Sequence, residues 1–180
     1  LLRHAATARQ VIVRESFESD LPQVLGDRGH FDQVFLNLLQ NALEAMSTGG
    51  VLVVKTSVRY DGDAEGDENG EDETSLTPSP SDSAVETSNG HGGPRLASDK
   101  ARGVPKAVVV TIRDTGGGIP ADLMPQLFNP FFTTRPDGVG LGLFVSQKLL
   151  AQVGGTIRAK SPAGKGTTFT VTIPVEAPEA

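Results

Sequence analysis

Apolar side chains recur every three or four residues between positions 29 and 46. This is the period of an α-helix, so we predict a helix over residues 29–46. Its apolar face would hold Phe31, Val34, Phe35, Leu38, Ala42 and Met46. A second helix is predicted at about residues 141–152, a short one near 122–127, and the residues before position 9 are predicted to end a helix.

Runs rich in β-branched residues predict strands. They lie at residues 11–17, 51–58, 107–112, 155–160 and 166–174. Strands and helices are therefore mixed along the chain, and we expect no βαβ alternation.

Residues 61–103 consist of Gly, Ser, Pro, Asp and Glu with scarcely an apolar side chain. Such a composition cannot offset its ordering entropy by burial, so we predict a disordered acidic insert within a single domain of residues 1–180. The flanking strands, 51–58 and 107–112, could pair, which would make the insert an overgrown hairpin loop. Long surface loops add little closure entropy, so the fold would tolerate it.

The net charge of −6 hides two unlike parts. Residues 61–99 carry eleven acidic side chains and one basic one, a net charge of −10, whereas the rest carries a net charge of +4. A mildly basic body suits a polyanionic nucleotide, and the acidic part cannot bind phosphate. The chain has no cysteine, which excludes disulfides and thiolate metal sites.

No apolar stretch approaches the ~20 residues that a membrane span requires, and the start of the chain is not typical of a signal peptide. The chain of 180 residues is long enough to bury its own core. We therefore expect a soluble, cytoplasmic domain without membrane contact or a nucleic-acid partner, whether or not a parent protein is membrane-anchored.

On the first predicted helix, Asn37 and Asn41 lie one turn apart beside the apolar face, with Gln33 and Glu44 on the same polar stripe. An amide oxygen can ligate Mg²⁺ without adding negative charge beside phosphates. Because Mg²⁺ keeps most of its waters, one Asn and phosphate oxygens would suffice. The simpler alternative is a pair of hydrogen-bonded polar residues at a helix edge.

Asp114 opens a glycine-rich loop, Asp-Thr-Gly-Gly-Gly, directly after a predicted strand. The glycines would let the backbone approach a flat ligand, while the carboxylate could accept a hydrogen bond from an adenine amino group. The alternative is a plain β-turn with a solvated Asp114.

Residues 138–142, Gly-Val-Gly-Leu-Gly, lead into the second long helix, whose unpaired amides would bind phosphate. The spacing fits neither the dinucleotide fingerprint nor a Walker A loop, and a plain glycine-rich helix start is the alternative. The preceding stretch, residues 127–135, is unusually aromatic for a loop. Its aromatic residues would either dock on a partner or close over a ligand, or else anchor the loop on the core.

Taken in chain order, the Asn37–Asn41 helix, the Asp114 loop, residues 127–135 and residues 138–142 resemble the N, G1, F and G2 boxes of the catalytic ATP-binding domain of sensor histidine kinases. The resemblance implies the Bergerat α/β sandwich, a mixed, mostly antiparallel sheet with helices on one face. It also implies that Asn41 ligates Mg²⁺, that Asn37 contacts phosphate or water, and that Asp114 binds adenine.

Further nucleotide-binding positions are implied by the same resemblance. Gly116 and Gly118 would approach the ligand, and Gly138, Gly140 and Gly142 would hinge a lid. Residues 164–169 are similar to the family's final glycine box, where Thr168 would assist adenine binding. The matching F and G boxes add Ile119, Phe131, Thr133 and Leu141 to the expected nucleotide contacts.

Glu44 departs from the family pattern, because many relatives carry Lys or Arg at this helix position. Its phosphate-neutralising role is therefore lost. We predict that Arg135 in the lid reaches the γ-phosphate instead, as a catalytic residue beside Asn37 and Asn41.

The resemblance implies an enzyme that transfers the γ-phosphoryl group of ATP to a histidine on a separate dimerisation domain, with a response regulator downstream. His4, His30 and His91 do not match the family's phosphoacceptor pattern, so this chain would supply only the catalytic domain. Two alternatives are an ATPase of the same fold and a nucleotide-binding regulatory module. In an ATPase, a glutamate would be expected where this chain has Asn37.

Overall fold

The computed structural model describes residues 2–47, 49–63, 103–135, 138–162 and 164–175. None of the helices in these ranges is both long and apolar enough to cross a membrane. In chain order the elements are α1 (Leu2–Ala8), β1 (Val11–Ser16), α2 (Arg28–Ala45), β2 (Gly50–Tyr60), β3 (Pro105–Arg113), η1 (Met124–Gln126), α3 (Gly142–Ala151), β4 (Thr156–Lys160) and β5 (Thr168–Pro174).

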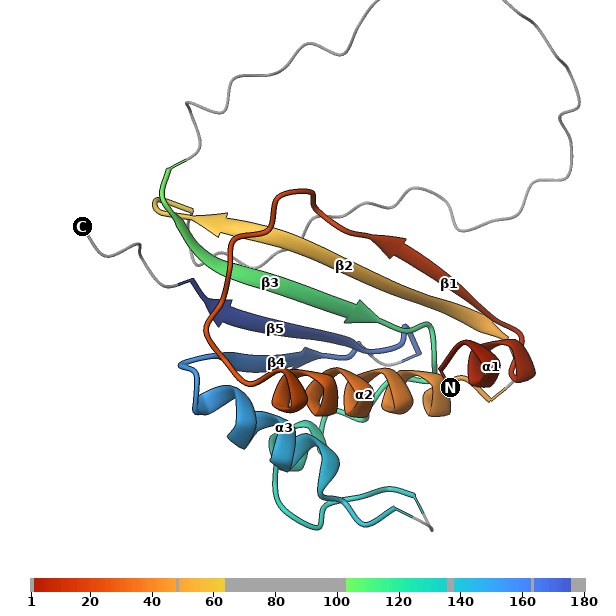
Figure 1. The fold of residues 1–180 in the computed structure, drawn as a ribbon. Coiled ribbons are helices and arrows are strands. Elements are labelled where there is room, and N and C mark those ends of the chain that lie inside the picture. Colours follow the sequence, from red (N-terminus) through yellow and green to blue (C-terminus); the bar gives the residue numbers. More distant parts are fainter. Residues whose placement is uncertain (1, 48, 64–102, 136–137, 163, 176–180) are drawn as a thin grey trace, which may run out of the picture.

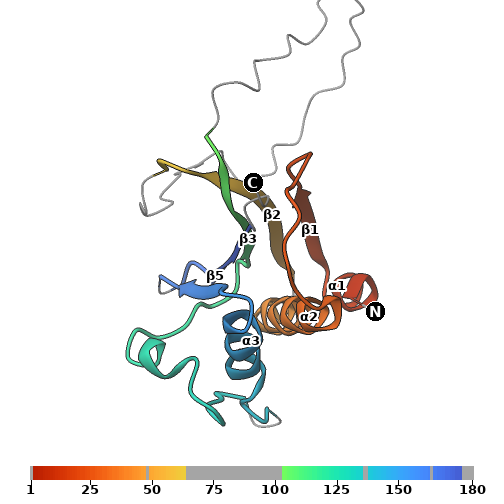
Figure 2. The same ribbon diagram turned by 60° about the vertical axis from the view of Figure 1, so that its left-hand side comes forward.

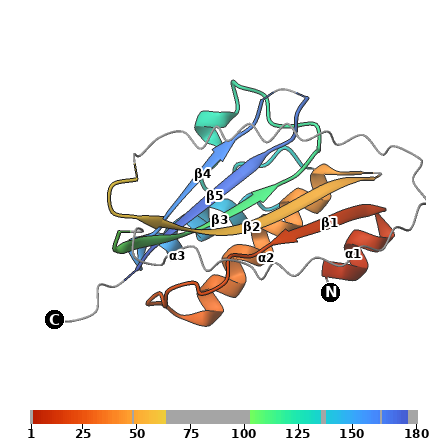
Figure 3. The same cartoon turned by 90° about the horizontal axis from the view of Figure 1, so that it is seen from above.

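The strands form one five-stranded sheet in the order β1-β2-β3-β5-β4. Of its four strand pairs, β1 and β2 run parallel and the other three are antiparallel. The helices lie together on one face of this sheet (Figures 1 and 2). Figure 3, seen from above, shows the five strands side by side with α2 and α3 beneath them. The predicted sandwich is therefore confirmed.

The chain shows no repeated βαβ alternation, as expected, but β1, α2 and β2 form one βαβ unit that the sequence did not predict. The two strands are the parallel pair, and α2 is the connection between them. Parallel strands buried on both faces show as continuous apolar runs. Here β1 is an edge strand whose residues after Val11 are all exposed. The usual signal of a parallel strand is therefore missing.

The core lies between the inner face of the sheet and the helices. Leu52, Ile112 and Val171 come from three neighbouring strands, and Val34 and Leu38 from α2. All five are almost fully buried. The apolar face predicted for the first long helix is confirmed, since Ala42 and Met46 are also buried and Phe31 and Phe35 pack against the core.

The ends of α2 are fixed by local chemistry. Asp27 caps its start, where Oδ1 accepts a hydrogen bond from the His30 amide at 3.1 Å. After its end, Gly49 and Gly50 adopt φ angles of +73° and +141°, which a residue with a side chain would resist. These contacts fix where α2 begins and ends.

The predicted hairpin around the acidic insert is confirmed at its base. β2 and β3 pair antiparallel from Val53 opposite Arg113 to Tyr60 opposite Pro105. Beyond the strands, the Asp61 amide donates to the Val104 carbonyl at 2.9 Å. Of the insert predicted over 61–103, residues 64–102 lie outside the described ranges. Its disorder remains a prediction.

Candidate functional site

One side of α2 meets three loops at positions four residues apart. The Asn37 side chain donates from Nδ2 to the Gly142 carbonyl at 3.2 Å. Asn41 Oδ1 accepts a hydrogen bond from Arg135. At Ala45 the backbone lies so close to Gly116 that a Cβ on this glycine would be 2.6 Å from the Ala45 carbonyl oxygen. Positions one helical turn apart share a face, so α2 gathers the three predicted loops along one line.

Asp114 follows directly on β3, and its side chain is buried, with 1% of its surface exposed. The Gly116 amide donates to its Oδ1 at 2.8 Å, and the Thr167 amide donates to the same oxygen at 3.2 Å. The alternative of a plain turn with a solvated carboxylate is therefore wrong. Both of these bonds go to Oδ1.

Burial raises the pKa of Asp114 above its ordinary value, because a charged carboxylate is poorly solvated there. The backbone hydrogen bonds from Gly116 and Thr167 favour the charged form and lower the pKa in part. The carboxyl is held in place by the backbone rather than by a neighbouring cation.

The final glycine box supplies contacts that the sequence did not predict. Gly166 has φ +79°, and a Cβ there would lie 2.0 Å from the Asp114 carbonyl oxygen. Ser161 Oγ accepts from the Ile119 amide at 2.7 Å and donates to the Gly166 carbonyl at 3.0 Å. Ile119, a predicted contact, is thus tied to this box. A Cβ on Gly118, at φ +75°, would meet the Pro162 carbonyl oxygen at 3.0 Å.

Two neighbouring threonines in this box have different positions. Thr167 is buried, and its amide holds Asp114. Thr168, the predicted adenine contact, begins β5 opposite Arg113 and is half-buried. The role of Thr168 in adenine binding stays a prediction. Thr167, rather than Thr168, is the residue in contact with Asp114.

Asn37 acts as a brace between α2 and α3. Besides Gly142, its Nδ2 donates to Ser146 Oγ at 3.3 Å, and Ser146 Oγ donates to the Gly142 carbonyl at 2.9 Å. The hydrogen-bonded polar residue that we considered as an alternative therefore describes Asn37 well. Its predicted contact with phosphate or water would have to use the remaining Oδ1.

The start of α3 offers amides to an anion. Leu141 occupies the N-cap position, and its side chain makes no capping hydrogen bond. Its carbonyl accepts from the Val145 amide at 2.8 Å, which begins the helical ladder. Amides of the first turn consequently have no partner within the helix, and they carry the positive end of its dipole.

The aromatic stretch divides between the two roles considered for it. Leu127 is buried and Phe128 packs against the core, so this part anchors the loop. Phe131, in contrast, is 71% exposed and adopts φ +64°, a left-handed conformation that is unfavourable for an aromatic residue. Its predicted contact with nucleotide is thus left open.

The predicted hinge glycines pack tightly against this stretch. A Cβ on Gly140, at φ +71°, would lie 2.5 Å from the Phe131 carbonyl carbon, and one on Gly138 would lie 2.4 Å from Thr133 Oγ1. Thr133 Oγ1 in turn accepts from the Arg135 amide at 3.1 Å. Gly142 differs, because a Cβ there would make only ordinary contacts with Asn37.

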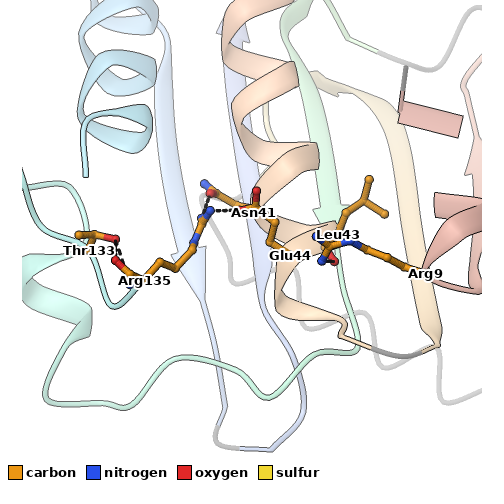
Figure 4. Close-up of polar contacts among 6 residues, drawn as sticks. All are labelled: Arg9, Asn41, Leu43, Glu44, Thr133 and Arg135. Carbon is orange, nitrogen blue, oxygen red and sulfur yellow. Dashed lines mark hydrogen bonds and ion pairs between the residues drawn. The ribbon is translucent and has the colours of Figure 1, made fainter. Parts of the chain in front are cut away.

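Figure 4 shows Arg135 reaching across from this loop to α2. Its Nη2 donates to Asn41 Oδ1, and its Nη1 forms an ion pair with Glu44 Oε2. On the other side of Glu44, Arg9 Nη1 donates to the Leu43 carbonyl at 2.9 Å. Partial burial lowers the pKa of Arg135, and the positive charge of Arg9 lowers it further. Asn41 and Arg135 were predicted as site residues from the sequence, whereas the ion pair between Arg135 and Glu44 was not.

The donor set fits a magnesium ion that is held mainly by phosphate. Among the described residues, no group of three or more His, Cys, Asp or Glu side chains could hold a metal ion. Asn41 presents a neutral oxygen that already faces a cationic group, the Arg135 guanidinium. One such oxygen is the small protein contribution that a Mg²⁺–nucleotide complex needs.

Part of the chain matches a known protein family. Residues 81–177 match the family model described as histidine kinase-, DNA gyrase B-, and HSP90-like ATPase. The sensor histidine kinase ZraS of Escherichia coli (strain K12) is 30% identical over 97% of this chain and 28% of its own length. The C4-dicarboxylate transport sensor protein DctB of Rhizobium meliloti (strain 1021) is 33% identical over 96% and 21%. The chain thus spans less than a third of either relative.

Solved structures share the fold. The mycobacterial sensor histidine kinase MprB superposes with a TM-score of 0.64 at 22% identity, covering 96% of this chain and 88% of that one. Full-length ShkA in complex with AMPPNP gives a TM-score of 0.61 at 22% identity, covering 98% and 30%.

Proposed function

Because the chain belongs to the histidine kinase-, DNA gyrase B- and HSP90-like ATPase family, we propose that it is the catalytic domain of a sensor histidine kinase. In this proposal it binds Mg-ATP and transfers the γ-phosphoryl group to a histidine on a separate dimerisation domain. The observation that carries the proposal is the line of contacts along α2, which gathers the Asp114 loop, Arg135 and the start of α3 beside Asn41 and Asn37. Full-length ShkA, which contains this fold, was solved in complex with AMPPNP.

Adenine recognition would fall to the Asp114 end of this line. The Oδ2 oxygen of the carboxylate would accept a hydrogen bond from the exocyclic amino group. Gly116 and Gly118 let the loop pack closely against the backbone of Ala45 and Pro162. The amide contacts from Gly116 and Thr167 hold the carboxylate in place before the base arrives. This rigid acceptor would select adenine over guanine, whose ring carries a carbonyl at the corresponding position.

Phosphate binding would fall to the other end. Asn41 would hold Mg²⁺, which neutralises the β- and γ-phosphate charge when bound. Arg135 would contribute a second positive charge at the γ-phosphate, and the first-turn amides of α3 would bind phosphate oxygens. During transfer, an imidazole nitrogen of the acceptor domain forms a bond to the γ-phosphorus. The bond from that phosphorus to the bridging oxygen breaks, and ADP leaves.

We do not expect the described histidines to serve as the acceptor, because the residues around them do not match the family's phosphoacceptor pattern. His4 is exposed on α1, and His30 lies in the first turn of α2, where its amide donates to the cap Asp27. His91 lies outside the described residues. The dimerisation domain and a downstream response regulator would therefore be separate partners.

Hydrolysis is the weaker alternative. An ATPase of this fold would need a general base to activate water one turn before Asn41. Asn37 stands there, is not a base, and has its amide nitrogen committed to Gly142 and Ser146.

The test is phosphotransfer in trans. The chain is mixed with γ-labelled ATP, Mg²⁺ and a helical dimerisation domain that carries a phosphoacceptor histidine, and label on that domain is followed with time. We expect labelling by the wild type, little by Asn41→Ala, and none on an acceptor whose histidine is changed to alanine. Release of free phosphate without labelled acceptor would contradict the proposal and favour the ATPase.

A further inference from the structure

Glu44 occupies a position that the proposed function leaves unexplained. A carboxylate beside the binding site of a triphosphate is unfavourable, because like charges repel. Yet Glu44 lies about one turn from Asn41 on the same side of α2. In this structure a neighbouring cation compensates its charge.

The compensation comes from Arg135. One planar guanidinium spans both side chains, with Nη1 on Glu44 Oε2 and Nη2 on Asn41 Oδ1. Figure 4 shows the three side chains converging from the loop and from α2. The side chains of Arg135 and Glu44 are 46% and 38% exposed, so the pair is open to solvent and can be broken.

The same contacts make Arg135 and a metal ion exclude each other at Asn41. An oxygen that ligates Mg²⁺ sits about 2.1 Å from the cation. A guanidinium N–H pointing at this oxygen would face that cation directly. Arg135 must therefore leave Asn41 Oδ1 before the amide can serve Mg²⁺.

The loop is built to hold Arg135 in this position. Its amide donates to Thr133 Oγ1 at 3.1 Å, and its carbonyl accepts from the Gly138 amide at 3.2 Å. Arg9, on the other side of α2, donates to the Leu43 carbonyl at 2.9 Å. Arg135 is thus the arginine that pairs with Glu44, and it also donates to Asn41.

We propose that Glu44 is a positioning residue that keeps Arg135 on Asn41 when no nucleotide is bound. Binding of Mg-ATP then displaces Arg135 from Asn41 and frees its guanidinium for the γ-phosphate. This inference rests on the proposed function, since it assigns the resting partner of the same arginine. Glu44 itself never touches the nucleotide. It sets the free-energy cost of moving Arg135.

A double-mutant cycle tests this proposal. Affinity for Mg-ATP is measured by calorimetry for the wild type, Glu44→Gln, Arg135→Gln and the double variant. Glu44→Gln reduces the repulsion between position 44 and phosphate whether or not Arg135 is present. When Arg135 is present, the substitution also removes the ion pair that ATP must break. We expect Glu44→Gln to tighten binding about threefold to fivefold more when Arg135 is present, the size of a partly exposed ion pair.

Two controls separate this role from a structural one. Glu44→Asp retains the charge and is expected to restore most of the wild-type affinity. The difference between the two backgrounds should shrink at high salt, because screening weakens the exposed pair. Thermal unfolding of each variant shows whether the domain stays folded.

Equal tightening in both backgrounds would overturn the inference, because it would mean that Glu44 acts through its field alone. So would weaker binding by Glu44→Gln. If the wild type itself fails to bind Mg-ATP, the proposed function fails first, which is a different result from binding without coupling.

Discussion

Asp114 combines deep burial with backbone hydrogen bonds, and burial has the larger effect on its pKa. A raised pKa means that the folded protein binds this proton more tightly than the unfolded chain does. Its contribution to stability is fully present below the ordinary pKa of an aspartate and is lost as the pH rises through the higher, folded-state pKa. Asp114→Asn cannot titrate in this range.

We therefore predict a pH-dependent difference between wild type and Asp114→Asn. The unfolding free energy of the wild type, relative to the variant, should fall as the pH rises through the folded-state pKa and level off above it. Urea unfolding of both proteins over a series of acidic pH values measures the difference. A difference that rises with pH would mean that the hydrogen bonds outweigh burial.

Gly166 lies so close to the Asp114 backbone that a side chain would not fit there. Gly166→Ala should be strongly destabilising, because its Cβ would overlap the Asp114 carbonyl oxygen. Gly164 is a matched control: it has a similar φ of +72°, but a Cβ there meets nothing within 4 Å.

In urea unfolding we expect Gly164→Ala to cost about 1–2 kcal/mol from the left-handed backbone alone. Gly166→Ala should cost roughly 1–3 kcal/mol more from overpacking. Equal costs for the two variants would show that the contact with Asp114 is not what excludes a side chain.

At the scale of single residues, the sequence was informative where side-chain chemistry carries the signal. Asn41 and Asp114 stand in motifs where the proposed chemistry requires an amide oxygen and a carboxylate. Thr167 was not predictable, because it acts through its backbone amide, which any residue other than proline possesses. The pairing of Glu44 with Arg135 was missed because the two residues lie far apart in sequence.

Among the elements, the most specific contact is the brace between α2 and α3. Asn37 and Ser146 form it together with the Gly142 carbonyl. Ser146 is fully buried, so its hydroxyl depends on this network. The brace keeps the start of α3 beside the site.

Breaking the brace should destabilise the domain. We expect Asn37→Ala to lower the unfolding free energy by about 1–3 kcal/mol, because it leaves Ser146 with fewer partners. Ser146→Ala made in the Asn37→Ala background should then cost less than Ser146→Ala alone. Chemical unfolding of the four proteins measures this coupling. Strictly additive costs would show that the two side chains act independently.

Helices and strands were predicted well because their signals are local. The apolar period of α2 and the β-branched runs of β3 and β5 all correspond to observed elements. The parallel pairing of β1 with β2 was missed, because pairing direction depends on how the chain returns to the sheet rather than on either strand. The positions of the site loops relative to α2 were likewise not predictable from spacing alone.

For the whole molecule, the hairpin base explains how a long insert is accommodated. The pairing of β2 with β3 and the Asp61–Val104 hydrogen bond close the sheet before the insert begins. The contacts described at the site all come from residues outside 64–102.

Replacing residues 64–102 with a short Gly-Ser turn should therefore preserve the fold and the affinity for ATP. Each halving of loop length lowers the closure cost by about 0.6 kcal/mol, so we expect a gain in stability of roughly 1–2 kcal/mol. Urea unfolding and calorimetry check both expectations. A Gly-Ser linker of the original length serves as the control that removes charge but not length, and loss of ATP binding by either variant would contradict this account.

The central claim is that α2 and the loops along it form a Mg-ATP site with adenine at Asp114 and the cation at Asn41. Calorimetric titration with ATP, with and without Mg²⁺, tests it most directly on the wild type, Asn41→Ala and Asp114→Ala. We predict that the wild type binds ATP and that Mg²⁺ strengthens binding. Asn41→Ala should lose most of the gain from Mg²⁺, and Asp114→Ala should bind poorly in both conditions. A wild type that does not bind ATP, or an Asp114→Ala variant that binds as the wild type does, would contradict the claim.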